Sequence, residues 1–217
     1  MSDHPPRANL RQRLFANLMA GQDQLNYELH HEKKAQLFEG ISGTVVEIGP
    51  GTGVNLQFLG EGVEWIGIEP NEAMHQHLRN EARALGREIK LYTGFAEDTG
   101  IADNSIDFVI STLVLCSVSD LAGTLYEITR VLKPGGRFIF LEHVADKKGT
   151  FRRLVQKTVP FTPWRFFADG CEPGREIGET IEEAGFANVE YKKIMQEGPG
   201  IILAINRPHI FGVATKG

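Results

Sequence analysis

Cysteine is scarce in this sequence, with only Cys116 and Cys171 among 217 residues. Two cysteines without short spacing make no disulfide framework and no zinc site on their own, so they indicate a reducing compartment, most simply the cytoplasm. The histidines add no metal motif, because His75 and His77 are two residues apart and would face different directions on a helix. We therefore expect no metal site.

Long apolar runs and an excess of positive charge are also lacking. No stretch approaches the roughly 18 uninterrupted apolar residues of a membrane span, and the first residues, "MSDHPPRANLRQRLFANL", have no signal-peptide core. Lys and Arg number 23 against 28 Asp and Glu, a net charge of −5, which argues against a nucleic-acid partner. The length and a hydrophobic content of 41% predict one domain with a substantial core.

Apolar and β-branched segments alternate with helical patterns along the chain. Helices are expected at 54–59, 71–85 (with Asn71 as N-cap), 121–132 and about 175–184, and strands at 44–48, 64–68, 89–92, 106–111, 137–141, 189–195 and 210–214. Pro134 and Gly135 predict a turn at 133–136, between the third helix and the fifth strand. Five strands with helical crossovers predict a doubly wound, mainly parallel α/β sheet. Two late strands, joined tightly, complete seven and make one of them antiparallel.

The segments outside these crossovers predict a cover for the sheet. Residues 10–38 read as one or two amphipathic helices with a break near Gly21, a lid over the carboxyl edge. The aromatic stretch "FRRLVQKTVPFTPWRFF" is interpreted as the roof of a site, and weak contact with a membrane surface is the alternative. The chain then divides into a lid (1–40), a core (41–146) and a substrate-side cover with the last strands (147–217).

The stretch "TVVEIGPGTG" places three glycines directly after the first expected strand. Ligands of open α/β sheets bind at this position, and glycine lets the backbone approach them closely. A dinucleotide fingerprint from Gly49 and Gly51 requires glycine or alanine at position 54, where Val54 stands, and Gly53 comes one residue early. A phosphate-binding P-loop requires Lys then Ser or Thr after the last glycine, and the chain has Val54 and Asn55.

The remaining pattern, E-x-G-x-G-x-G, resembles the cofactor loop of class I S-adenosylmethionine-dependent methyltransferases. The resemblance implies that Glu69, at the end of the second strand, meets the two ribose hydroxyls, a bond that fixes orientation. A helix-start acid is the alternative for this residue. It further implies that Ala96 and Glu97 border the adenine. The predicted cofactor residues are Glu47, Gly49, Pro50, Gly51, Gly53, Glu69, Pro70, Ala96, Glu97, Thr112 and Leu113.

Four further stretches, "TLVLCSV", "FLEHVA", "DGC" and "RPHIFGVATK", resemble the methyltransferase-like family 7 proteins, which include the animal thiol S-methyltransferases. The resemblance covers about Lys33 to Lys216. It departs at Pro50, where that family has cysteine, and at the first 31 residues, which are polar here, so membrane anchoring is not carried over. It implies methyl transfer to a small-molecule thiol. Methylation of a quinone or lipid precursor at carbon or oxygen, and a non-catalytic cofactor-binding module, are the alternatives.

Removal of a proton from the acceptor requires little help if the acceptor is a thiol, because a thiol of pKa near 8.5 is already partly ionised at neutral pH. His143, His209 and Asp98 are the candidate catalytic residues, since each is expected at or near the carboxyl edge of the sheet. Cys116 lies in an apolar run and is interpreted as a small core residue.

Overall fold

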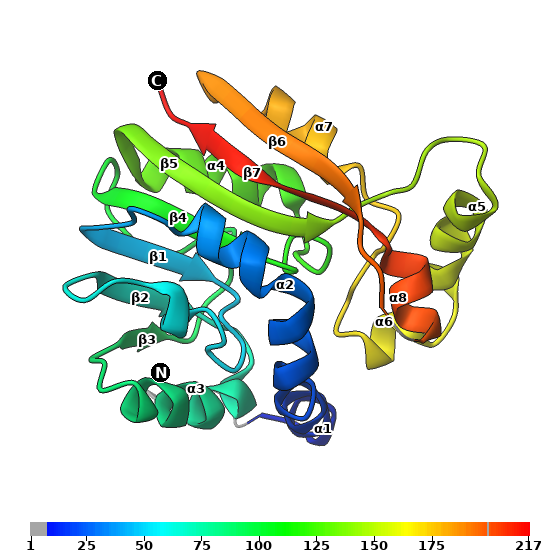
Figure 1. Cartoon of the computed structure of the whole chain (residues 1–217), viewed down its shortest axis with the longest axis horizontal. Coiled ribbons are helices and arrows are strands. Elements are labelled where there is room, and N and C mark those ends of the chain that lie inside the picture. Colours follow the sequence, from blue (N-terminus) through cyan, green and yellow to red (C-terminus); the bar gives the residue numbers. More distant parts are fainter. Residues whose placement is uncertain (1–7, 199) are drawn as a thin grey trace, which may run out of the picture.

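The computed structural model describes residues 8–198 and 200–217. Seven strands form one sheet in the order β3-β2-β1-β4-β5-β7-β6 (Figure 1). The strands are β1 (Thr44–Ile48), β2 (Glu64–Ile68), β3 (Lys90–Tyr92), β4 (Ile106–Thr112), β5 (Leu132–His143), β6 (Asn188–Met195) and β7 (Pro208–Thr215). The helices are α1 (Leu10–Ala20), α2 (Asp23–Leu37), α3 (Glu72–Ala84), α4 (Leu121–Val131), α5 (Phe151–Thr158), α6 (Trp164–Phe167), α7 (Ile177–Glu183) and α8 (Ile201–Asn206), with short 3₁₀ turns η1 (Leu56–Phe58) and η2 (Val159–Phe161).

The strand directions confirm the predicted sheet. β1 to β5 pair in parallel, and β7 is antiparallel to both of its neighbours, β5 and β6. The strand order reverses between β1 and β4, which is where open α/β sheets bind ligands, beyond the carboxyl ends of the strands.

Alternation along the strands builds a core on each face of the sheet. In β5, Phe138 and Phe140 pack with Leu125 of α4 and Ile181 of α7, whereas Ile139 packs on the other face, in the same core as α3. All five of these side chains are buried, and full burial of an aromatic or branched aliphatic side chain contributes about 1.5–3 kcal/mol. The two cores explain why helices cover both faces.

The helix expected at 54–59 is wrong, because only the 3₁₀ turn η1 forms there. Leu56 N donates to Gly53 O and Phe58 N to Asn55 O, so the hydrogen bonds span three residues rather than four. The stretch is too short to sustain an α-helix, and Asn55 directs its side-chain amide to Glu47 and Thr112 instead. The predicted N-cap of α3 is confirmed, since Asn71 Oδ1 accepts from Ala73 N at 3.0 Å.

Two connections also differ from expectation. Residues 133–136 belong to β5 rather than to a turn before it, and the irregularity appears as a register shift against β4, with Gly135 at φ +75°. β6 and β7 are not joined tightly, because residues 196–207 between them include α8.

The helices outside the crossovers gather at the carboxyl end of the sheet. Figure 1 shows α1 and α2 on the near side and α5, α6 and α8 beyond the end of β5. None of the helices in the described ranges combines the length and apolar character required to cross a bilayer.

Candidate active site

The glycine loop after β1 folds back against the end of β2. Gly49 N donates to Ile68 O at 2.9 Å, and Gly49 and Gly51 have φ values of +59° and +56°. A Cβ on Gly49 would lie 2.7 Å from Val114, whereas a Cβ on Gly51 would meet no atom within 4 Å. Gly49 is therefore required by packing, and Gly51 faces open space beyond the strand end.

Glu69, at the end of β2, holds this loop in place. Its Oε2 accepts from Gly51 N at 3.0 Å, its Oε1 accepts from Asn71 N at 2.8 Å, and the residue is 6% exposed. Burial raises the pKa of Glu69 to about 7, against the lowering effect of both hydrogen bonds. The negative charges of Asp169 and Glu47 add to the rise. The carboxyl group keeps acceptor capacity for a ligand, because each oxygen has more than one lone pair.

A cavity of about 330 Å³ opens above the loop, within the usual range of about 300–1,000 Å³ for small-molecule sites. Of the predicted cofactor residues, those that line it are Gly49, Pro50, Gly51, Glu69, Pro70, Ala96, Glu97, Thr112 and Leu113. Helices α1 and α2 and the loop after β4 contribute further lining residues. Most of the residues expected to hold the cofactor are thus brought together around one cavity.

Glu47 and Gly53 lie beneath the cavity rather than in its lining. Glu47 is 1% exposed and accepts from Asn55 Nδ2 at 2.7 Å and from Trp65 Nε1 at 2.9 Å. Burial raises its pKa. A Cβ on Gly53 would lie 3.3 Å from Leu78, so this glycine allows close packing against α3. Both residues support the loop from below.

Lys34 of α2 was missed by the sequence analysis. It lines the cavity, is 2% exposed, and burial lowers its pKa to about 8 although Glu47 and Asp23 raise it. The signal in the sequence was the spacing of His30 and Lys34, two polar residues four apart that share the buried face of the helix. A lysine on that face is a cation held in position at the cavity wall.

The N-terminal helices are fastened over the cavity by polar contacts. An ion pair of 2.9 Å joins the Arg11 guanidinium to Asp169, which lies just after α6, and Asn71 Nδ2 donates to Gln12 O at 3.1 Å. Thr52 Oγ1 of the glycine loop donates to Asp23 Oδ1 at 2.7 Å. These contacts fit the predicted lid, and whether it opens stays a prediction.

The three candidate catalytic residues lie outside the lining of the cavity. Asp98 is exposed, while His143 and His209 are paired in register between β5 and β7, with ring centroids 6.2 Å apart. Burial lowers the pKa of His209 to about 4. Burial alone would lower the pKa of His143, but the neighbouring Cys116 sulfur outweighs it and raises that pKa. The catalytic role of these residues stays a prediction.

The loop after β4 owes its shape to a buried acid that the sequence analysis did not assign. Glu142 is fully buried, and its carboxyl group accepts from Ser111 Oγ at 2.6 Å and from Val114 N at 3.0 Å. These bonds hold the turn at Leu113, whose φ is +60°. A branched residue with positive φ is strained, and Glu142 keeps it at the cavity wall.

The fold, with its glycine loop, strand-end acid and cavity at the switch point, is that of a class I methyltransferase. A family model described as "Methyltransferase domain" matches residues 46–140. The solved structure of geranyl diphosphate C-methyltransferase from Streptomyces coelicolor, in complex with Mg²⁺, geranyl diphosphate and S-adenosyl-L-homocysteine, has a TM-score of 0.68 at 14% identity and covers 90% of this chain and 85% of its own. These matches agree with the curated relatives described next, which show that the chain is a methyltransferase, and the cofactor of this class is S-adenosyl-L-methionine.

Two curated relatives indicate which family of methyltransferases the chain belongs to. Thiol S-methyltransferase TMT1B of Rattus norvegicus is 36% identical over 215 residues, which cover 93% of this chain and 86% of the relative. Demethylmenaquinone methyltransferase of Staphylococcus aureus is 28% identical over 220 residues, which cover 88% and 91%. The chain belongs to the family of the TMT1 thiol S-methyltransferases.

Proposed function

We propose that this protein transfers the methyl group of S-adenosylmethionine to the sulfur of a small, fairly hydrophobic thiol. The observation that carries the proposal is the 36% identity to a thiol S-methyltransferase along nearly the whole chain, including the cover of the site. The two unpaired cysteines suit a reducing compartment such as the cytoplasm, in which thiol acceptors stay reduced.

The cavity offers a complementary group for each polar part of the cofactor. The Glu69 carboxylate would accept the ribose hydroxyls, and the Lys34 ammonium would hold the carboxylate of the amino-acid part, since both residues line the cavity. The turn at Ala96 and Glu97 would border the adenine. Glu97 keeps that turn in place, because its Oε1 accepts from Ser119 N at 2.8 Å. Bound in this way, the cofactor supplies an activated methyl group on a positively charged sulfur.

The protein's contribution to the reaction is orientation and exclusion of water. An in-line displacement gains most of its acceleration from the fixed approach of the two reactants. The lid helices and the strained turn at Leu113 both line the cavity. We propose that the acceptor reacts as the thiolate formed by its own ionisation, because His143, His209 and Asp98 do not line the cavity.

A thiol panel at several pH values tests the acceptor. We expect methyl transfer to small thiols at rates that follow the thiolate fraction, with a fall once the thiol becomes so acidic that its nucleophilicity declines. Glu69→Ala, measured in parallel, should lose activity on every thiol. Binding of S-adenosylhomocysteine without turnover on any acceptor would indicate a non-catalytic module instead.

The runner-up is methylation of a quinone precursor, favoured by the 28% identity to demethylmenaquinone methyltransferase. A naphthoquinol and a phenol belong in the same panel for this reason. Faster turnover on either one than on every thiol would refute the acceptor and leave the methyltransferase itself standing.

A further inference from the structure

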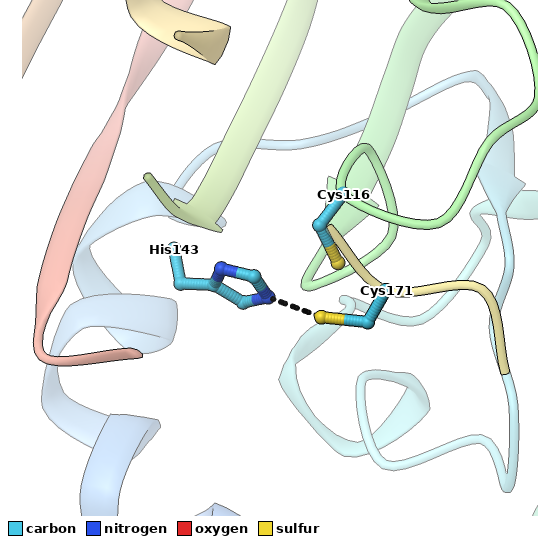
Figure 2. A group of neighbouring side chains, drawn as sticks. All are labelled: Cys116, His143 and Cys171. Atoms are coloured by element: carbon cyan, nitrogen blue, oxygen red, sulfur yellow. Dashed lines mark hydrogen bonds between the residues drawn. The ribbon is translucent and has the colours of Figure 1, made fainter. Parts of the chain in front are cut away.

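The structure gathers Cys116, His143 and Cys171 into one buried cluster behind the cavity wall. Cys116 lies in the loop after β4, His143 is the last residue of β5, and Cys171 lies between α6 and α7. Figure 2 shows the three side chains turned toward one another, with Cys171 Sγ 3.4 Å from His143 Nε2. All three ligand atoms lie within 4.8 Å of one another, and each residue is at most 7% exposed.

We propose that Cys116, His143 and Cys171 form a binding site for one thiophilic divalent cation, Zn²⁺ above all, with a water molecule in the fourth position.

The separations in the cluster fit such an ion. Zn–S bonds of about 2.3 Å and Zn–N bonds of about 2.0–2.1 Å, at tetrahedral angles, place ligand atoms roughly 3.6–3.8 Å apart. The observed 3.4 Å and the limit of 4.8 Å therefore require only small rotations of side chains to close around a metal. The donor types agree as well, since thiolates with imidazole are the ligands that Zn²⁺ prefers.

The charge of the site suits its burial. Two thiolates and a neutral imidazole around a divalent cation sum to no net charge, so the complex avoids the cost of an unpaired ion in the interior. The contacts of Cys116 Sγ with Ser117 Oγ and Leu113 O are long, at 3.5 and 4.0 Å, so coordination of a metal by this sulfur would replace weak interactions.

The backbone around the ligands is already fixed. Glu172 N donates to Cys116 O at 2.9 Å, which ties the segment of Cys171 to that of Cys116. The Arg175 guanidinium donates to Leu115 O at 3.0 Å and to Val118 O at 2.7 Å. A site held in this way loses little conformational entropy when the ion binds.

Occupancy of the site would also stiffen the cavity. Val114, Ser117 and Val118 line the cavity, and they flank Cys116 in the same loop. Asp169, two residues before Cys171, lines it as well and pairs with Arg11 of the lid. The ion would join the loop after β4 to the cover of the site.

Cobalt substitution of the reduced, chelator-stripped full chain tests the proposal. We expect one equivalent of Co²⁺ to produce a thiolate-to-cobalt charge-transfer band with visible bands of tetrahedral intensity, and one equivalent of Zn²⁺ to abolish them. Zn²⁺ should also slow alkylation of both cysteines and raise the unfolding midpoint.

Variants assign the ligands. Cys171→Ser and His143→Ala should each lose the tetrahedral spectrum, and His75→Ala, a change at another buried histidine, should keep it. The wild-type chain decides the question even if a ligand variant does not fold. Absence of the charge-transfer band from the folded, reduced protein with Co²⁺ present would overturn the metal site.

Discussion

Glu69 is the residue whose replacement tests the cofactor site most directly. Its carboxyl group joins the glycine loop to the start of α3 through Gly51 N and Asn71 N, and it faces the cavity from the end of β2. A hydrogen bond to a charged group contributes about 1.5–3 kcal/mol when its partner is removed. We therefore expect Glu69→Ala to raise the Kd for S-adenosylhomocysteine about 10- to 150-fold, measured by calorimetric titration.

The pH dependence of the same binding sharpens this expectation. Because burial raises the pKa of Glu69 to about 7, the carboxylate must lose a proton before it accepts both ribose hydroxyls. One unit below that pKa the wild type should bind roughly tenfold more weakly than with the carboxylate fully ionised, and above the Lys34 pKa of about 8 the loss of the ammonium charge should weaken binding again. The rise in affinity through pH 7 is the part that belongs to Glu69. Glu69→Gln should remove this dependence. For folding the sign is opposite: the empty folded protein holds a proton that the unfolded chain releases, so Glu69 lowers stability as the pH rises from about 4.5 through 7.

Glu72→Gln is the matched control. Glu72 lies in the first turn of α3, three residues after Glu69, and it does not line the cavity. Its replacement weakens the helix start by the same dipole effect that the alternative interpretation assigns to Glu69. If Glu69→Ala binds the ligand normally with its circular dichroism unchanged, or if Glu72→Gln weakens binding equally, Glu69 has no part in the cofactor site.

Four other predictions follow from named contacts. Lys34→Met should weaken S-adenosylhomocysteine binding about 30-fold or more, as loss of a buried charge partner does. It should also raise the melting temperature of the protein measured without ligand, because it removes a buried cation. A variant in which affinity and melting temperature both fall, or both rise, contradicts the proposed role. Gly51→Val should bind S-adenosylhomocysteine more weakly still than Glu69→Ala, since the valine side chain would enter the cavity and the φ of +56° is strained for a branched residue. Normal binding by calorimetry would show that the loop interpretation is wrong. Deletion of residues 1–21 removes α1 and its Arg11 ion pair, so the KM for S-adenosylmethionine should rise while circular dichroism still reports a folded sheet. Unchanged kinetic constants would show that this segment has no part in covering the cavity. His209→Ala should lower kcat on thiols by far less than the hundredfold typical of a lost general base. A hundredfold loss of kcat at neutral pH that becomes smaller at high pH would instead establish His209 as the base.

The sheet and the cofactor loop were predictable because their signals are local. β1, β2 and β4 are rich in Val, Ile and Phe, and the predicted boundaries lie within one residue of the observed ones. The spacing of the glycines was enough to predict Gly51 as a residue of the cofactor loop. The structure shows why glycine suits this position, because Gly51 has a left-handed backbone conformation and faces the cavity. Helix 54–59 failed since its residues are recruited by tertiary hydrogen bonds that local propensity does not contain.

The rest of the site depends on contacts between distant segments. The Cys116, His143 and Cys171 side chains come from three separate elements, so no spacing rule for metal ligands applies to them. Asp169 lines the cavity and pairs with Arg11, a residue far away in the chain. Lys34 stands in a polar helix, and the spacing of His30 and Lys34 shows that they share a face but not that this face is buried beside Glu47.

The two perturbed groups of the cavity have a common physical origin. Burial shifts the pKa of Glu69 up to about 7 and that of Lys34 down to about 8, so burial disfavours the charged form of each group. A ligand that brings hydroxyl donors to the first and a carboxylate to the second stabilises both charged forms at once. The cavity thus disfavours its own charges until a zwitterionic nucleoside ligand supplies their partners, and the protein selects such a ligand over an apolar molecule of the same size.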